Sequence, residues 1–518
     1  MIFWAFCSVI KGIGKKAKRM MKKKSKLLGA VFSMTGFVVF SKLIGFVKQM
    51  VTAAYFGTSI ETDLLSLSQG LISNIEYVLA QTLLTSFTAV YIYIRKKDEN
   101  EANIFTENVH NIIVLLSACV IVLLLICAPI LAKIIAPSYT SELHDKLSTL
   151  LRIHAPVFLL FSLCALYRAM LNANEKFALG EFTSILQNII IIGFVVLLGN
   201  RIGPNSLIWS TYAYSLINIV YLVCVTQNER RETFKPTKMR DDPNVKEFLK
   251  MSAPLFFGYA VVYINQLVDK ILVSGLDTGS VTALSYASVL SNLVCTLMTT
   301  LSTILFTYIT KELAEGNVEK ANILCNRTVF LVSCVIIPIT IVVFISAKEI
   351  VEIVFKRGQF DANSVSIASH ALQGYAIMFL PYSVRGLYNQ LQYAYKNSKK
   401  PMFNNTIAII VNVVLSIILC QIFGVFGVAL ATSLASFTNM FLNILSAKRI
   451  CKDLNYGYFR NKVIPISLAT IMCIVFTALV YKHIDMSSSL LKFTLISVIA
   501  IVSFSPCAVP LIIKEIKR

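Results

Sequence analysis

Long apolar stretches are the feature that most restricts how this chain can fold. The 518-residue sequence contains fourteen apolar runs of about 20 residues or more, the length that an α-helix needs to cross a bilayer. Only 14% of the residues are charged, whereas soluble domains average about 25%. The sequence therefore predicts an all-α polytopic membrane protein.

The apolar runs form two groups of six followed by two more. The expected spans are 27–48, 62–94, 110–136, 146–172, 181–199 and 205–226, then 251–275, 281–311, 322–346, 368–395, 402–423 and 424–448, then 463–481 and 489–513. Fourteen spans place both termini on one side. Basic residues gather on that side, in segments 11–26, 230–250, 396–400 and 448–462, so the positive-inside rule predicts cytoplasmic termini.

These spans suggest a division of the chain into five parts. We expect a basic cytoplasmic tail over 1–26, a six-helix lobe over 27–226, a cytoplasmic linker over 227–250, a second six-helix lobe over 251–448, and two extra helices with a short cytoplasmic tail over 449–518. No soluble segment approaches the size of an independent domain.

The second half of the chain repeats part of the first. Seven residues recur at one offset, namely Leu151, Ala155, Phe158, Leu159, Ser162, Leu166 and Tyr167, which match Leu372, Ala376, Phe379, Leu380, Ser383, Leu387 and Tyr388. Asn188 matches Asn412 and Thr62 matches Thr282 at similar offsets. Because each half holds an even number of spans, the repeats run in parallel, as in transporters that hold a substrate between two halves.

Several function classes are disfavoured by the sequence. The net charge of +21 lies in short loops, as topology signals do, so we expect no nucleic-acid partner. The chain lacks a P-loop, a C-x-x-C pair, an H-E-x-x-H helix and a serine nucleophile elbow. We therefore expect a transporter that makes and breaks no bond, with no organic cofactor.

Charged residues inside spans are the candidate functional residues, because such charges are costly unless they face a cavity or a partner. Cations there suit a phosphate. We assign substrate binding to Lys42, Lys48, Asp63, Glu76 and Lys270, and a cation-ligand or ion-pair role to Asp269. We assign no chemistry to four other span residues, which are Arg152, His154, Arg168 and Arg385.

Four strings carry a family resemblance. They are FSKLIGFVKQMVTAAYFGTSIETD at 40–63, VDKILVSGLDTGSVTALSYAS at 268–288, FKRGQF at 355–360 and GVFGVALATSLASFTN at 424–439. Their order resembles that of the MurJ-type lipid II flippases, members of the multidrug, oligosaccharidyl-lipid and polysaccharide exporter superfamily. The resemblance covers residues 27 to about 513.

The resemblance implies an alternating-access flippase in the bacterial cytoplasmic membrane. Its cargo would be an undecaprenyl-diphosphate-linked saccharide, moved from the inner to the outer leaflet among membrane lipids. Enzymes of cell-wall or polysaccharide synthesis stay open as further partners. Family positions for the diphosphate fall on Lys42 and Lys48, and the outer-loop motif falls on Arg357, Gly358 and Phe360.

The resemblance also raises the question of sodium coupling. Sodium-binding relatives use an acid that falls here on Asp269, and positions that fall on Asn412, Ser416, Val428 and Thr432. Oxygen ligands suit a hard cation, but Ser416 stands where those relatives have a carboxylate. Interhelical hydrogen bonding is the alternative role of Asn412 and Thr432.

Departures from the family keep other functions open. The second span has no arginine before Arg95, and Val289 stands where lipid II flippases have another arginine. Lysine in the first span lacks the bidentate fork of arginine. The alternative cargo is another lipid-linked oligosaccharide, for capsule, a teichoic-type polymer or exopolysaccharide. The chain could also be a cation-coupled multidrug exporter, a polysaccharide ligase or polymerase, or a scaffold without transport.

Overall fold

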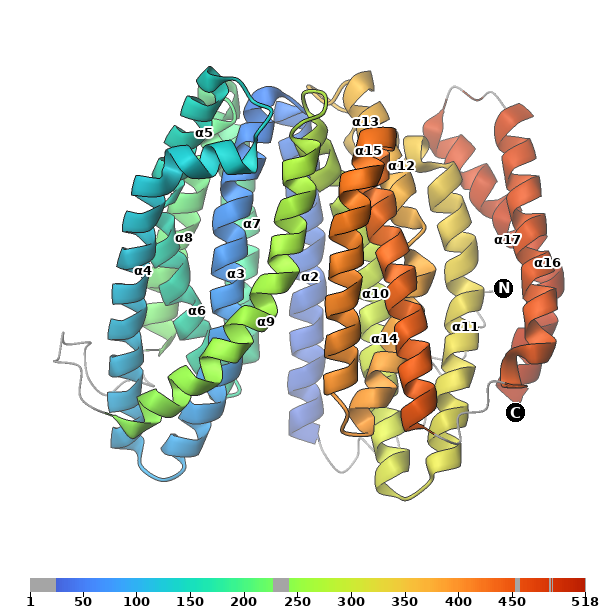
Figure 1. The fold of residues 1–518 in the computed structure, drawn as a ribbon, viewed down its shortest axis with the longest axis horizontal. Coiled ribbons are helices and arrows are strands. Elements are labelled where there is room, and N and C mark those ends of the chain that lie inside the picture. Colours follow the sequence, from blue (N-terminus) through green and yellow to red (C-terminus); the bar gives the residue numbers. More distant parts are fainter. Residues whose placement is uncertain (1–24, 227–241, 452–456, 484–485, 487, 518) are drawn as a thin grey trace. The chain divides into compact units, whose positions relative to one another are not determined.

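The structure is a computed structural model that describes residues 25–226, 242–451, 457–483, 486 and 488–517. Throughout these ranges the regular elements are α-helices (Figure 1). Most of the expected basic tail and part of the expected linker, residues 1–24 and 227–241, lie outside the described residues. The helices are α2 Ser25–Phe56, α3 Ile60–Arg95, α4 Glu99–Ile135, α5 Ser141–His154, α6 Val157–Ala173, α7 Phe177–Ile202, α8 Asn205–Thr226, α9 Pro243–Val273, α10 Ser280–Ala314, α11 Val318–Ile345, α12 Ala347–Phe355, α13 Ala362–Ala376, α14 Phe379–Ala394, α15 Lys399–Ile450, α16 Gly457–His483 and α17 Ser489–Lys517.

The described chain forms two compact units. The N-terminal unit comprises residues 25–282 and also 357–360, and the C-terminal unit comprises 283–356 and the described residues from 361 onwards. Helix α9, with which we begin the second lobe, packs along α3 and α4 in the N-terminal unit. The lobe boundaries at 226 and 251 stay a prediction.

The helices follow the expected spans with three differences. Among the described residues, ten helices are long and apolar enough to cross a membrane, or eleven when α5 and α6 count as one span bent by 41°. That bend falls at Pro156, which has no N–H for the helix ladder. A matching break separates α13 from α14. The expected boundary between spans 402–423 and 424–448, by contrast, coincides with the non-helical backbone of Gly424 (φ 57°, ψ −134°), which divides the 52-residue element α15 into two helices. The short helix α12 lies in a segment that we expected to be a loop.

The backbone repeats where the sequence repeats. Ser162 Oγ donates to Phe158 O at 2.7 Å in α6, and Ser383 Oγ donates to Phe379 O at 2.6 Å in α14. Both helices end at a non-glycine residue with positive φ, Glu175 at 58° and Lys396 at 59°. A bond spanning five residues closes each end, from Lys176 N to Leu171 O and from Asn397 N to Gln392 O. The sequence repeat thus corresponds to a structural repeat, down to the same left-handed helix cap.

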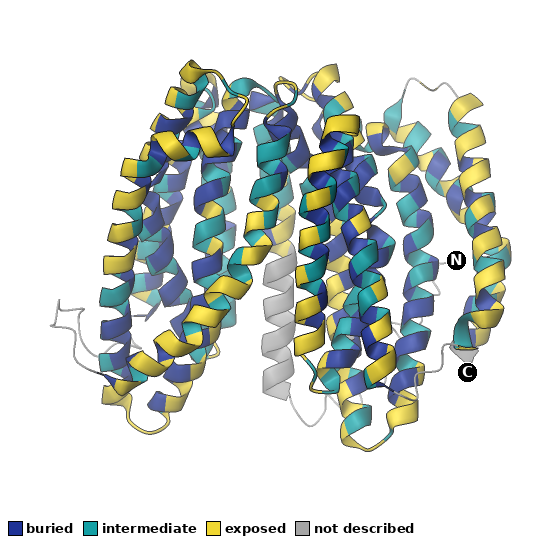
Figure 2. Cartoon of the chain, viewed as in Figure 1, coloured by how far each residue is buried: buried dark blue, intermediate teal, exposed yellow. Residues whose placement is uncertain are grey.

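Apolar side chains fill each unit and also cover parts of its surface. In the N-terminal unit, Phe87 stacks on Tyr91 and Phe105 between α3 and α4. Parts of helix α4 are exposed, coloured yellow in Figure 2. Its exposed aliphatic residues include Leu116, Leu123, Ile126 and Ile130. Helix α16 likewise exposes aliphatic residues in the C-terminal unit. Exposed apolar surface of this extent is rare in soluble monomers and fits contact with lipid.

Candidate functional site

Asp63 lies at the start of α3 and binds the start of α10. Its side chain is buried, and its oxygens accept three hydrogen bonds. Gly279 N donates to Oδ2 at 2.7 Å, and Thr282 N and Oγ1 donate to Oδ1 at 2.8 and 2.7 Å. A carboxylate satisfies the free N–H groups of a helix N-terminus well. This geometry favours a structural role for Asp63, whereas its assigned role in substrate binding stays a prediction.

Lys270 on α9 contacts α3 shortly after Asp63, at Ser66 and Gly70. Its Nζ donates to Ser66 O at 3.1 Å, and it lies so close to Gly70 that a Cβ there would come within 2.6 Å of Nζ. Glycine at position 70 therefore makes room for the lysine head group. Asp63 and Lys270 are both assigned to substrate binding. Asp63 lies in the first turn of α3, and Lys270, which belongs to α9, contacts the next turns of α3.

The other three residues assigned to substrate binding lie elsewhere in the N-terminal unit. Lys42 is exposed and Lys48 is half-buried on α2, and their charges are close enough to repel. Glu76 is half-buried on α3, thirteen residues or about 20 Å of helix from Asp63. The five residues therefore do not form one cluster.

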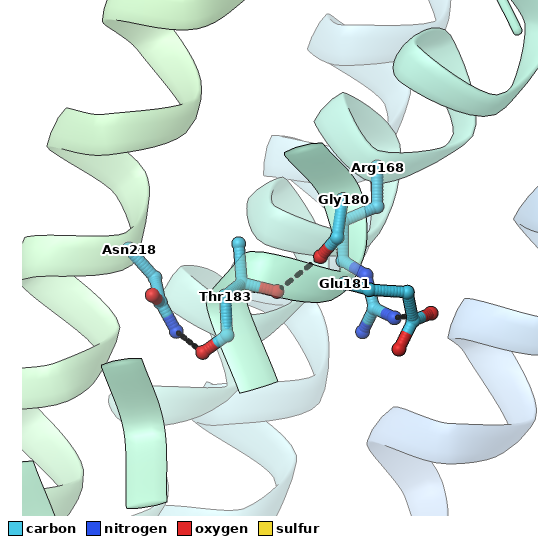
Figure 3. Close-up of polar contacts among 5 residues, drawn as sticks. All are labelled: Arg168, Gly180, Glu181, Thr183 and Asn218. Atoms are coloured by element: carbon cyan, nitrogen blue, oxygen red, sulfur yellow. Dashed lines mark hydrogen bonds and ion pairs between the residues drawn. The ribbon is translucent and has the colours of Figure 1, made fainter. Parts of the chain in front are cut away.

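Glu76 shares its surroundings with an arginine to which we assign no chemistry. Arg168 on α6 is close enough for its charge to act on Glu76, and its Nη2 pairs with Glu181 Oε1 on α7 at 3.3 Å. Figure 3 shows the Arg168 side chain reaching Glu181, beside the bonds from Thr183 to Gly180 and from Asn218 to Thr183. Sequence reasoning missed this cluster because Glu76 precedes Arg168 by 92 residues, and Glu181, 13 residues after Arg168, lies on a separate helix.

The residues expected to bind sodium belong to two units. Asp269 is buried on α9 of the N-terminal unit. In the C-terminal unit, Asn412 Nδ2 donates to Thr432 Oγ1 at 3.0 Å, and Ser416 Oγ donates to Asn412 Oδ1 at 3.3 Å. Thr432 Oγ1 also donates to Val428 O, at 3.4 Å. These neutral oxygens link the two halves of α15 across the Gly424 kink. Among the described residues, no group of three or more His, Cys, Asp or Glu side chains could hold a metal.

The outer-loop motif packs on the end of α2. Gln359 N donates to Ala54 O at 2.9 Å, and Phe360 is buried. Gly358 has φ 57°, and a Cβ there would come within 2.1 Å of Ala54 O, so only glycine fits. The next residue, Asp361, accepts bonds from Ser364 N and Oγ, which hold the pKa of this carboxyl below its usual range and cap α13.

Solved structures share this fold. A structure of the lipid II flippase MurJ in an inward closed conformation aligns with a TM-score of 0.78 at 23% identity, covering 94% of this chain and 99% of that one. A multidrug resistance MATE family transporter in an inward-facing conformation aligns with a TM-score of 0.66 at 12% identity, covering 80% and 95%. The shared fold and the long apolar helices define a multi-pass membrane protein.

Sequence comparison identifies the family. The family profile described as lipid II flippase MurJ matches residues 52–504. Two relatives, each named as a probable lipid II flippase MurJ, come from Buchnera aphidicola. The one from subspecies Baizongia pistaciae is 25% identical over 80% of this chain and 82% of its own length. The one from subspecies Acyrthosiphon pisum is 25% identical over 87% and 89%. The chain belongs to the MurJ family of lipid II flippases.

Proposed function

We propose that the protein moves lipid II, or a closely similar peptidoglycan precursor, from the inner to the outer leaflet of the cytoplasmic membrane. The observation that carries this proposal is the family match over residues 52–504, which includes nearly every described helix. Alternating access is supported by the fold. Structures that share it occur in inward closed, inward-facing and outward-facing conformations.

We further propose fourteen membrane spans. A helix of 52 residues would be about 78 Å long, more than twice the thickness of a hydrocarbon core, so α15 contributes two spans on either side of Gly424. The bent pairs α5–α6 and α13–α14 contribute one span each. With α2, α3, α4, α7, α8, α9, α10, α11, α16 and α17, the total is fourteen, which places both termini in the cytoplasm by the loop charges.

For the cargo we propose contacts from the first span. Lys42 is exposed and Lys48 is half-buried on α2. Two repelling ammonium groups in one helix favour an anion nearby, and the diphosphate of a polyprenyl-linked saccharide supplies one. Glu76 would then act on the cargo through its neighbour Arg168 rather than by direct contact with phosphate, because two anions repel each other.

A second candidate cargo is another polyprenyl-diphosphate-linked oligosaccharide. The observation that favours it is the residue set of α3 and α10. Helix α3 carries no arginine before Arg95 at its last position, and α10 carries Val289 where the family has an arginine. Both cargoes share the lipid and the diphosphate and differ in the sugar.

Sodium coupling is a separate proposal. Asn412, Ser416, Val428 and Thr432 supply the candidate oxygen ligands on α15. The carboxylate of Asp269 on α9 is the candidate that the family resemblance adds. Asn412 Nδ2 donates a hydrogen bond to Thr432 Oγ1, so a sodium ion would have to replace this bond to be coordinated by Thr432 Oγ1. Transport that needs sodium, and that Asp269→Asn abolishes, would support the scheme.

Complementation of a bacterial strain depleted of its own lipid II flippase tests the main proposal. We expect the parent chain and Lys133→Ala, which alters an exposed lysine on α4, to restore growth, and Lys42→Ala and Asp269→Ala to fail. Failure of a well-expressed, membrane-inserted parent chain would contradict lipid II as the cargo and favour another oligosaccharide.

A further inference from the structure

The repeated helices α6 and α14, one in each unit, both carry an arginine. Arg168 lies on α6 and Arg385 on α14, the two helices that share the serine bond and the left-handed cap. By the offset of the sequence repeat, Arg385 corresponds to Cys164, which is one helical turn before Arg168. The two arginines therefore lie on the same face of their helices, one turn apart.

The partners of the two arginines are also equivalent. Arg168 Nη2 pairs with Glu181 Oε1 at 3.3 Å, and Arg385 Nη1 donates to Asn405 Oδ1 at 3.4 Å. Glu181 and Asn405 lie in the second turns of α7 and α15, at the same offset that relates Asn188 to Asn412. The same arrangement of an arginine on the fourth span and a polar acceptor on the fifth thus occurs in each unit.

Both guanidinium groups keep most of their donors for another partner. A guanidinium has five N–H donors, and each of these arginines uses one of them in a long bond among the described residues. Arg168 is 32% exposed at its side chain, and Arg385 is half-buried with its guanidinium 4.6 Å from the centre of the Tyr382 ring. Such donors are free to bind an anion in the bidentate way that suits phosphate.

The uncompensated charge of Arg385 is a further argument that this residue binds an anion. Its two described contacts, the Asn405 amide and the Tyr382 ring, are neutral. A membrane-spanning helix rarely carries a cation without a carboxylate unless the cation serves a function. By comparison, the ammonium group of Lys270 donates a hydrogen bond to Ser66 O and packs beside Gly70.

We propose that Arg168 and Arg385 each provide, within their own unit, a binding position for a phosphate group of the lipid-linked cargo. This inference rests on the proposed function. Glu181 and Asn405 are positioning residues, because they hold the arginines through single bonds that an incoming phosphate can replace.

Binding of undecaprenyl diphosphate to the purified full-length protein in nanodiscs tests the proposal. We expect Arg168→Gln and Arg385→Gln each to weaken binding roughly tenfold, the loss typical of one charged hydrogen bond. Binding of undecaprenol, which lacks phosphate, should stay unchanged, whereas misfolding would weaken both. Arg201→Gln, at the exposed end of α7, is the matched control and should bind as the parent does. Arg168→Lys and Arg385→Lys should recover part of the loss.

The outcomes separate this proposal from the proposed function. If the parent protein does not bind undecaprenyl diphosphate, the proposed function fails, and this inference fails with it. If the parent binds it and both glutamine variants bind equally well, the inference is overturned and the proposed function stands. A phosphatidylglycerol headgroup offers the same phosphate chemistry. If phosphatidylglycerol displaces the probe from the parent at equal concentration, the arginines bind bulk lipid and the inference is overturned.

Discussion

Asp63 shows how a single residue can suit two opposite interpretations. A buried carboxylate at the start of a span is typical of a ligand-binding residue, and the family resemblance gives the same expectation. The structure gives it three donors from a segment more than 200 residues away, in the loop before α10 and its first turn. Hydropathy locates Asp63 at a helix start, but no local pattern reveals which distant N–H groups meet it.

The structural role of Asp63 predicts a loss of stability. Asp63→Ala leaves three buried donors without an acceptor, so we expect a loss of about 3 kcal/mol in unfolding free energy. The measurement is the thermal unfolding midpoint of the purified protein in detergent. Asp277→Ala, an exposed carboxylate in the same loop, is the control and should change the midpoint little. An Asp63→Ala protein with the parent midpoint and no transport would show that Asp63 serves the cargo instead.

At the scale of helices, apolar runs predict most elements but not their breaks. The division between spans at residue 424 coincides with the Gly424 kink, because glycine alone adopts that backbone at no cost. The bends at Pro156 and between α13 and α14 were missed, since an apolar run continues through each. Lys462 was also misplaced. Its charge suggested a cytoplasmic loop, whereas it lies buried in α16.

Lys462 on α16 forms a buried ion pair with α17 and contacts an aromatic ring of α11. Its Nζ lies 2.7 Å from Glu515 Oε1, with side-chain exposures of 11% and 4%, and 4.5 Å from the centre of the Phe330 ring. Lys462→Met would leave the buried Glu515 carboxylate without its cationic partner and with only neutral donors such as the Tyr458 hydroxyl, so we expect it to cost about 3 kcal/mol. Adding Glu515→Leu should restore most of the stability, because both buried charges are then removed.

Thermal unfolding of both variants checks this prediction for α16 and α17. The matched control is Lys311→Met, which breaks an exposed pair with Glu315 at 3.8 Å and should cost less than about 1 kcal/mol. A double variant no more stable than Lys462→Met alone would contradict the account. Packing around the lysine stem, rather than its charge, would then hold these helices together.

At the scale of the whole molecule, the repeat could be predicted from sequence and its exceptions could not. Matching residues on α6 and α14 indicated two related halves, and the paired caps at Glu175 and Lys396 agree. The sequence did not indicate that residues 357–360 would belong to the N-terminal unit, while α12 and α13 on either side belong to the other. The contact of Gly358 with Ala54 depends on the packing of distant segments, which a single chain's pattern does not encode.

Residues 357–360 therefore form a short excursion of the chain whose attachment to α2 should be necessary for transport. Gly358→Ala places a methyl group 2.1 Å from Ala54 O at φ 57°, a conformation that costs a residue with a Cβ about 1–2 kcal/mol before the clash is counted. Since 1.4 kcal/mol is a factor of ten, the detached loop should become roughly tenfold more populated, and trypsin should cleave after Arg357 faster by a similar factor.

Gly203→Ala carries the same backbone strain, at φ 59°, with no atom within 4 Å of its Cβ, so it should leave cleavage at Arg357 unchanged. We expect Gly358→Ala, but not Gly203→Ala, to lose complementation. If cleavage after Arg357 is as slow in Gly358→Ala as in the parent, the loop tolerates the methyl group, and its attachment to α2 is not what the glycine maintains.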